Sequence, residues 1–140
     1  MIKMDQRGQI SIEFVLILAL MAVIVSSIGL YIGTANENSV IISAARSGAD
    51  NATTSLAMLN TNMIPVRVDD ISNYTSGQYT IIQVDISGSL STNQTNTTIN
   101  SILNSIAAQG YTRVNTTTPD TAPQNDYVVT NRHKYKVTLV

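Results

Sequence analysis

The pattern of apolar positions divides the chain into two unlike parts. Residues 10–32 are dense in large aliphatic side chains, whereas the rest of the chain is rich in Asn, Thr and Ser. The nineteen residues 14–32 carry no charge. As a helix rising ~1.5 Å per residue they would span about 28 Å, which is close to the ~30 Å hydrocarbon core of a bilayer. The pattern therefore predicts one membrane-spanning helix.

A helical pattern continues beyond this apolar run. Small and apolar residues recur at spacings of three and four, and they are Val40, Ile41, Ala44, Ala45, Gly48, Ala52, Leu56, Met58, Leu59 and Met63. Pro65 cannot continue a helix and restricts the residue before it. We expect one long helix over about residues 9–62, with an apolar first half and an amphipathic second half that packs on the head.

After Pro65 the pattern changes to short strands. Residues 66–71 and 78–87 alternate around a turn at 73–77 and predict a hairpin. Residues 88–96 are expected to form a polar loop. Apolar residues at i, i+3, i+4 and i+7 then predict a short helix that Gly110 ends: Ile99, Ile102, Leu103 and Ile106. Further strands are expected at 111–117, 127–130 and 135–140, with a loop over 116–126. The predicted fold class is α+β, with a head of four or five β-strands and one short helix.

Charge next to the apolar run predicts its orientation. Lys3 and Arg7 precede the run, and the next basic residue is Arg46. Basic residues flanking a span favour the cytoplasmic side. We expect the precursor in the cytoplasmic membrane, with Met1 inside and everything after about Thr34 outside.

The residues before the span resemble the class III signal of archaeal type IV pilins. A basic and a small residue, Arg7 and Gly8, precede a Q-x-S-x-E-F motif made of Gln9, Ser11, Glu13 and Phe14. The resemblance implies cleavage between Gly8 and Gln9 by a prepilin-peptidase-like membrane aspartyl protease. It also implies that Glu13 is the fifth residue of the mature chain. Archaellins share the general leader but not this mature start, which favours a pilus subunit.

This resemblance implies a structural subunit of an extracellular adhesion pilus. Its expected parts are a leader at 1–8, a membrane and filament-core helix at 9–35, an amphipathic continuation at 36–64 and an extracellular α+β head at 65–140. The expected partners are other copies and other pilins, the processing protease, the pilus assembly platform, and the membrane before assembly. No cofactor, enzymatic activity or nucleic-acid partner is expected.

Two features of the helix bear on assembly. A buried carboxylate is expensive unless it is paired, and the new α-amino group of Gln9 can neutralise Glu13 on a neighbouring subunit. The alternative is a carboxylate that the helix dipole favours and that water reaches at the membrane surface. A stripe of small residues would also let helix backbones approach, although such residues are common in membrane helices: Ala22, Ser26, Gly29 and Gly33.

The head offers sites for modification and for contacts. The chain has no cysteine, which excludes disulfides and thiol chemistry, and its net charge is −1. Five Asn-x-Ser/Thr matches are candidate N-glycosylation sites, although a chain rich in Asn and Thr also produces them by composition: Asn51, Asn73, Asn93, Asn96 and Asn115.

For the charged residues of the head we favour structural explanations over functional ones. Asp69, Asp70 and Asp85 could hold calcium across the hairpin, but solvated carboxylates account for them better. The lone His133 lies in a basic run with Arg132, Lys134 and Lys136. Contact with nucleic acid or a cell surface is one reading of this run. Lysines that protect an exposed edge strand are the favoured reading.

Two other functions stay open at this level. One is a single-pass, membrane-anchored surface binding protein that does not polymerise. The other is a secreted protein, with an enzyme among the options, released by cleavage after the small residues Gly33, Thr34 and Ala35. The absence of a recognisable nucleophile motif or metal-ligand spacing counts against the secreted enzyme.

Overall fold

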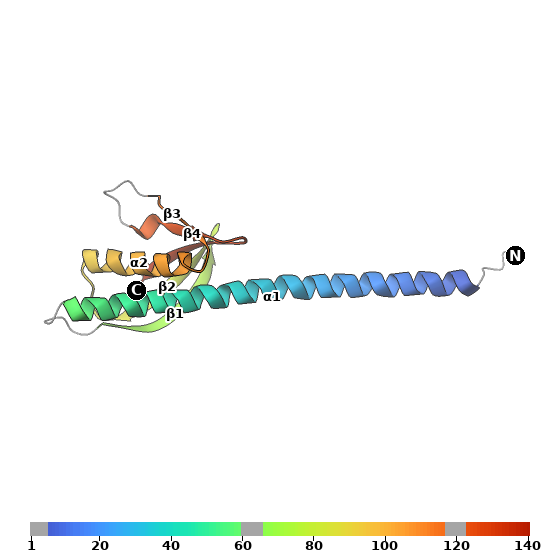
Figure 1. Cartoon of the computed structure of the whole chain (residues 1–140), viewed down its shortest axis with the longest axis horizontal. Coiled ribbons are helices and arrows are strands. Elements are labelled where there is room, and N and C mark those ends of the chain that lie inside the picture. Colours follow the sequence, from blue (N-terminus) through green and yellow to red (C-terminus); the bar gives the residue numbers. More distant parts are fainter. Residues whose placement is uncertain (1–5, 60–65, 117–122) are drawn as a thin grey trace. The chain divides into compact units, whose positions relative to one another are not determined.

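The computed structural model of the 140-residue chain describes residues 6–59, 66–116 and 123–140, with side chains described from Ile12 onward. The elements in chain order are α1 (Gln6–Leu59), β1 (Arg67–Ser76), β2 (Tyr79–Ser87), α2 (Thr92–Ala107), β3 (Thr112–Val114), the short 3-10 helix η1 (Pro123–Asn125), β4 (Tyr127–Val129) and β5 (Lys134–Leu139) (Figure 1). The long apolar helix, the five-stranded sheet and the second helix confirm the α+β class. The chain divides into two compact units between Glu37 and Asn38, and α1 contributes to both.

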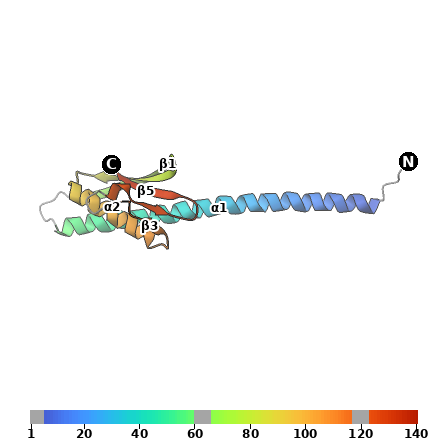
Figure 2. The same ribbon diagram turned by 90° about the horizontal axis from the view of Figure 1, so that it is seen from above.

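The second unit has two layers. Its sheet has the strand order β1-β2-β5-β4-β3, and β2 pairs with β5 in parallel whereas the other neighbours are antiparallel. Figures 1 and 2 show α2 beside the second half of α1. The core between the helices and the sheet consists of Ile41, Ala44, Ala45, Ala49, Ile71, Ile82, Val84, Ile99, Ile102, Leu103, Ile106, Val128, Tyr135 and Val137.

Alternation along the strands gives the sheet one buried and one open face. In β2 the side chains of Thr80, Ile82 and Val84 are buried, and those between them are half-buried. In β5, Tyr135 and Val137 are buried in the same way. Successive side chains of a strand point to opposite faces of the sheet. The buried side chains therefore belong to the face that the helices cover, and the half-buried ones belong to the other, open face.

The second half of α1 packs closely on α2, as its amphipathic pattern predicted. A Cβ atom added at Gly48 would lie 2.7 Å from the Cα of Ile102. The Ser101 hydroxyl donates a hydrogen bond of 2.8 Å to the Gly48 carbonyl. The pattern was wrong at its margins, because Val40, Met58 and Leu59 are exposed. Met63 and Pro65 lie outside the described residues.

The first residue of α1 and the position of the hairpin turn differ from those that the sequence predicted. Helix α1 begins at Gln6 rather than near residue 9, and its predicted last turn at 60–62 lies outside the described residues. The turn expected at 73–77 was wrong, because β1 continues to Ser76, which pairs with Tyr79. A two-residue connection closes the hairpin, and Gly77 supplies the positive φ of 59° that such tight connections need.

The loop expected at 88–96 was also wrong, because α2 already begins at Thr92. Ser91 accepts a hydrogen bond from the Gln94 backbone, and the Gln94 side chain accepts one from the Ser91 backbone. This capping box satisfies amide groups that the first helical turn leaves without partners. The strand expected at 111–117 is shorter than predicted, since β3 ends at Val114.

A buried ion pair joins β3 to the residue just before β4, and side chains of α2 bind the same guanidinium. The Arg113 guanidinium donates to Asp126 at 2.7 Å, and the two side chains are 18% and 3% exposed. The same guanidinium donates to the side-chain oxygens of Asn100 and Asn104. Asp126 also accepts a hydrogen bond from the Thr116 backbone. Both charges thus have additional polar partners, as buried ions require, whereas the Arg113 Nε atom has none among the described residues.

We expect Gly48→Ala to lower the free energy of unfolding of the head by about 1–3 kcal/mol, because the added methyl group overpacks the contact with α2. Urea unfolding of the detergent-solubilised chain, followed by near-ultraviolet circular dichroism, measures the change. Gly29→Ala is the matched control, since a Cβ at Gly29 meets no atom within 4 Å. Equal stability of the two variants would contradict the close α1–α2 contact.

We expect Asp126→Asn to lower the free energy of unfolding by about 3 kcal/mol, because it leaves the mostly buried Arg113 charge without its counterion. The matched control is Asp69→Asn. Asp69 also pairs with an arginine, Arg67, at 2.7 Å, but those side chains are 45% and 80% exposed. An exposed pair contributes about 0–1 kcal/mol, so comparable losses in the same unfolding assay would refute the structural role of the buried pair.

Candidate functional site

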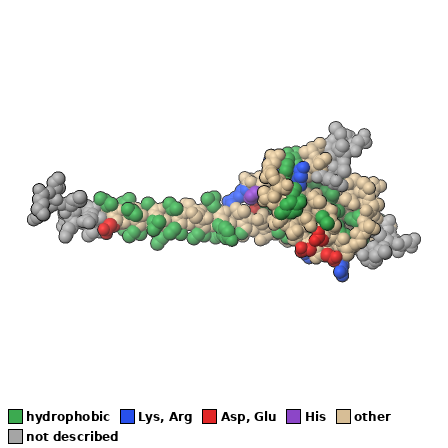
Figure 3. Space-filling view, turned by 180° about the vertical axis from the view of Figure 1, so that it is seen from behind, with side chains coloured by type: hydrophobic (Ala, Val, Ile, Leu, Met, Phe, Trp, Pro, Cys, Tyr) green, Lys and Arg blue, Asp and Glu red, His purple; other side chains and the backbone are tan. Residues whose placement is uncertain are grey.

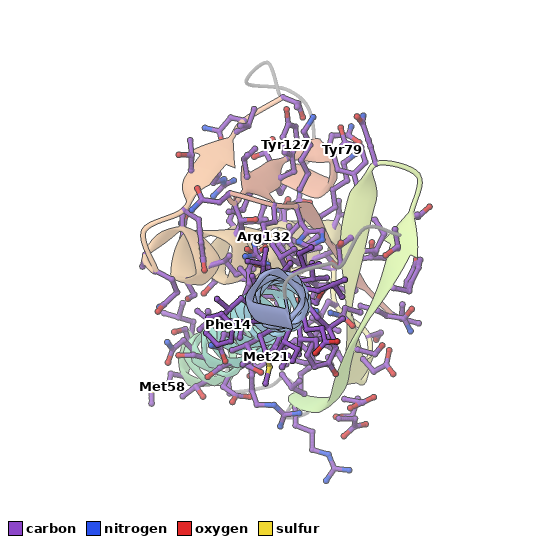
Figure 4. All side chains as sticks on the ribbon, turned by 90° about the vertical axis from the view of Figure 1, so that its right-hand side faces the viewer. Phe14, Met21, Met58, Tyr79, Tyr127 and Arg132 are labelled. Carbon is purple, nitrogen blue, oxygen red and sulfur yellow. The ribbon has the colours of Figure 1, made fainter. Side chains whose placement is uncertain are left out.

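The first half of α1 presents a mostly apolar surface. Every residue from 12 to 32 is exposed, and the large apolar side chains among them range from 44% exposed at Ile24 to 77% at Tyr31. Figure 3 shows these hydrophobic side chains along this part of the helix. In Figure 4, Phe14 and Met21 project from neighbouring parts of its circumference, as residues seven apart on a helix do. Exposed apolar surface on this scale marks a membrane or protein contact.

This helix satisfies the length and composition required to cross a bilayer. Its polar side chains are also compatible with an apolar environment. The hydroxyls of Ser26, Ser27 and Thr34 donate to the carbonyls four residues earlier, at 2.8, 2.8 and 3.2 Å. Because these donors are bonded within the helix, burying them in lipid or in protein leaves these three hydroxyls paired.

The predicted stripe of small residues lies on this part of α1. Ala22, Ser26 and Gly29 are exposed and Gly33 is half-buried. The space beside Gly29 is open, since a Cβ there would touch no atom within 4 Å. Within the first unit the stripe is therefore available as a contact surface for a neighbouring helix.

The predicted processing residues lie at the start of α1. The backbone of residues 6–11 is helical, so the Gly8–Gln9 bond falls in the first turns. The side chains of Arg7, Gln9 and Ser11 lie outside those that the structure describes. Glu13 is exposed, and no ion pair shown between described residues involves it. A protease that cuts at Gly8 would need this end of the helix to open, which helix termini do readily.

The five sequons differ in accessibility. Asn115 is exposed and lies just after β3, outside any helix or strand. Asn51 and Asn93 are exposed on α1 and α2. Asn73 is half-buried in β1, and Asn96 is half-buried in α2 with its Oδ1 atom enclosed and without a hydrogen-bond partner. The geometry therefore separates the candidates that the sequence could not rank.

The acidic residues of the hairpin do not form a metal site in the described part of the chain. Asp70 and Asp85 face each other across β1 and β2, whereas Asp69 pairs with Arg67. No group of three potential metal ligands occurs among the described residues. The His133 ring packs edge-to-face on Tyr135, with 5.9 Å between ring centroids.

The edge-strand explanation of the basic run was wrong. Strand β5, which carries Lys134 and Lys136, lies in the middle of the sheet between β2 and β4. The lysine ammonium groups instead lie over tyrosine rings, Lys136 over Tyr79 at 4.4 Å and Lys134 over Tyr127 at 5.8 Å from the centroids. Sequence reasoning missed this cluster because it depends on strand pairing, although the alternation of Lys134, Tyr135 and Lys136 does place both lysines on one face.

Comparison with known proteins gives no relative of this chain. No protein-family model matches it, and no curated protein or solved structure is significantly similar. The functional assignment therefore rests on the chain's own residues and geometry.

In the native host we expect N-glycan attachment at Asn115 in preference to Asn96, because a transferase reaches an exposed, non-helical asparagine more easily than one enclosed within α2. Cleavage after Arg113 puts Asn115 and Asn96 on different tryptic peptides, so mass spectrometry of the glycopeptides separates Asn115 from the other sites of the head. Asn115→Gln should reduce the mass of the glycosylated chain by one glycan, while Asn96→Gln should leave it unchanged. Occupancy at Asn96 with none at Asn115 would contradict this ranking.

Proposed function

We propose that this chain is the precursor of a structural subunit of an extracellular, archaeal type IV-like adhesion pilus. The observation that carries the proposal is the combination at the N-terminus. A leader-like Arg7–Gly8 and a Q-x-S-x-E-F start stand directly before an apolar helical segment on which every side chain from 12 to 32 is exposed.

In this proposal the subunit has no catalytic step of its own. The prepilin-peptidase-like protease removes residues 1–8, and the helix then leaves the bilayer and packs among the helices of neighbouring subunits. Lipid and a bundle of apolar helices both shield this surface from water, so the transfer is close to neutral in hydrophobic terms. Close packing along the stripe at Ser26 and Gly29 then favours the bundle. The assembly platform supplies the work of extraction.

Glu13 would set the axial register between neighbouring subunits in the filament. Its carboxylate is the only charge between Arg7 and Glu37. A lone carboxylate inside a helix bundle is costly, and a cationic partner offsets that cost. Cleavage at Gly8 creates such a partner in the α-amino group of Gln9, four residues away. An amine on one subunit and Glu13 on the next would pair in one axial register only.

A membrane-anchored surface protein that does not polymerise is the second candidate. The exposed apolar surface of α1 favours it equally, because lipid alone covers such a surface. Release by cleavage after Ala35 is less well supported, since Ala35 lies within the continuous helix α1 (Gln6–Leu59), far from either of its ends.

The mature N-terminus distinguishes these candidates. We expect Edman sequencing or mass spectrometry of the protein from native membranes and filaments to give Gln9 as the first residue. An intact Met1 would support the non-polymerising anchor, and a start at Asn36 would support the secreted protein. Either result would overturn the pilus proposal.

We further expect Glu13→Ala to be processed normally and to yield at least about tenfold fewer filaments, because the register pairing is lost while the apolar helix is unchanged. Electron microscopy and shearing of filaments from cells measure the yield. Asp50→Ala is the matched control, since it removes an exposed carboxylate from the second half of α1. Wild-type filament yield from Glu13→Ala would refute the register role.

A further inference from the structure

The open face of the sheet carries opposite charges at its two ends. One end holds a Tyr–Lys cluster, which consists of Tyr79, Tyr127, Lys134 and Lys136. The other end holds an acidic pair, Asp70 and Asp85. Tyr79 and Asp85 are six residues apart in β2, which is about 20 Å along an extended strand. The two charged groups are therefore segregated on one surface.

The Tyr–Lys cluster holds its positive charges in defined positions. The Tyr79 and Tyr127 rings meet edge-to-face, with centroids 5.5 Å apart, and Figure 4 shows them side by side. A lysine ammonium group lies over each ring, which is a favourable cation–π arrangement. Because the ammonium groups cover ring faces, the cluster is poorly suited to stacking on nucleic-acid bases.

Neither Lys134 nor Lys136 forms an ion pair with an acid among the residues that the structure describes. Lys136 is the register partner of Ile81, four residues before Asp85, or about 13 Å along the strand. Its side chain leans toward Tyr79 instead, 4.4 Å from that ring. The two positive charges are thus available to a negative group from outside the chain.

The acidic pair is the complementary feature. Asp70 and Asp85 stand directly opposite each other in the antiparallel register, an arrangement of like charges that destabilises a sheet. Asp85 accepts one hydrogen bond, from the Gln83 side chain at 3.1 Å, and Asp70 is exposed. Figure 3 shows acidic side chains gathered on the surface of the head. An external cation would relieve the repulsion that the fold itself leaves in place.

We propose that the Tyr–Lys cluster of one copy of the chain binds the acidic pair of the next copy. Each copy carries one of each group, so the contact is head-to-tail and can repeat without closing, as in a filament. The inference builds on the proposed pilus function and adds a contact between heads to the packing of helices. Exposed ion pairs are individually weak and are screened by salt, but a filament repeats the contact at every subunit.

Charge reversal tests the proposal. We expect Lys134→Glu/Lys136→Glu to reduce filament yield at least about fivefold, and the added pair Asp70→Lys/Asp85→Lys to restore it by exchanging the two charges. Arg46→Glu, at an exposed position on α1, changes the net charge in the same direction away from both groups and is the control. Near-ultraviolet circular dichroism checks that each head is folded. Normal filaments from the lysine variant, or no rescue in a folded quadruple variant, would overturn the contact.

The lack of native cysteine permits a second, direct test. In Asp85→Cys/Lys136→Cys the two positions are about 13 Å apart within a chain, and disulfides need Cα atoms closer than about 7 Å. Oxidised filaments should therefore give a ladder of linked subunits on a non-reducing gel, and each single-cysteine variant should give dimers at most.

The outcomes also separate this proposal from the pilus proposal. Filaments that contain Gln9-initiated subunits but give no ladder would overturn the head contact and leave the pilus function intact. An unprocessed chain that forms no filaments would overturn the pilus function. Oxidation of that unprocessed double-cysteine chain in native membranes would still test the head contact, because linked copies support it and unlinked copies refute it.

Discussion

The close approach of α1 and α2 at Gly48 is the contact on which the second unit depends. The backbone of α2 at Ile102 lies so close to Gly48 that a methyl group in place of the glycine hydrogen would clash with it. Buried alanines on both sides of Gly48 continue this narrow seam along α1. The larger side chains of α2, Ile99 and Ile106 among them, then fill the space against the sheet. Small residues on one helix thus allow large residues on the other to form the core.

The two halves of α1 meet opposite requirements with one continuous backbone. From Ile41 onward the helix buries small residues inside its own chain, whereas from Ile12 to Ile32 it buries none. In the proposed function, the first half obtains its apolar environment from other molecules, first from lipid and then from other copies. Its hydroxyls, bonded to the helix's own carbonyls, fit both environments. In the proposed filament, this division would let the first half of the helix change partners while the second half keeps one permanent contact.

The sequence predicted those features that depend on local periodicity. The 3.6-residue repeat gave α1 and the buried face of α2, and the two-residue alternation gave the hairpin and the buried side of β2. The errors arose where local composition and local geometry disagree. The Asn- and Thr-rich stretch before Ile99 looked like a loop, but the reciprocal bonds of Ser91 and Gln94 start a helix there. The extended stretch before Gly77 looked like a turn, but a two-residue connection sufficed.

Local sequence patterns do not predict the order of strands in the sheet. The observed order changes the explanation of the basic residues Lys134 and Lys136. Nothing in residues 134–139 indicates that this strand pairs with β2 on one side and β4 on the other. Only that pairing moves Lys134 and Lys136 from an assumed edge to the centre of the sheet, beside Tyr79 and Tyr127. The sequons show the same limit, since the motif is identical at Asn96 and Asn115 but the surroundings are not.

The central place of β5 has a consequence for the order of biogenesis. This strand is the last in chain order, yet it joins the β1–β2 hairpin to the β3–β4 pair. The two halves of the sheet cannot be united until residues as far as Leu139 have been synthesised, and such long-range strand pairing folds slowly. By that time the N-terminal helix has long since emerged from the ribosome. If the chain is the proposed pilus precursor, insertion of this helix into the membrane would thus precede completion of the head, and each subunit would be tethered before it could present a finished surface to another copy.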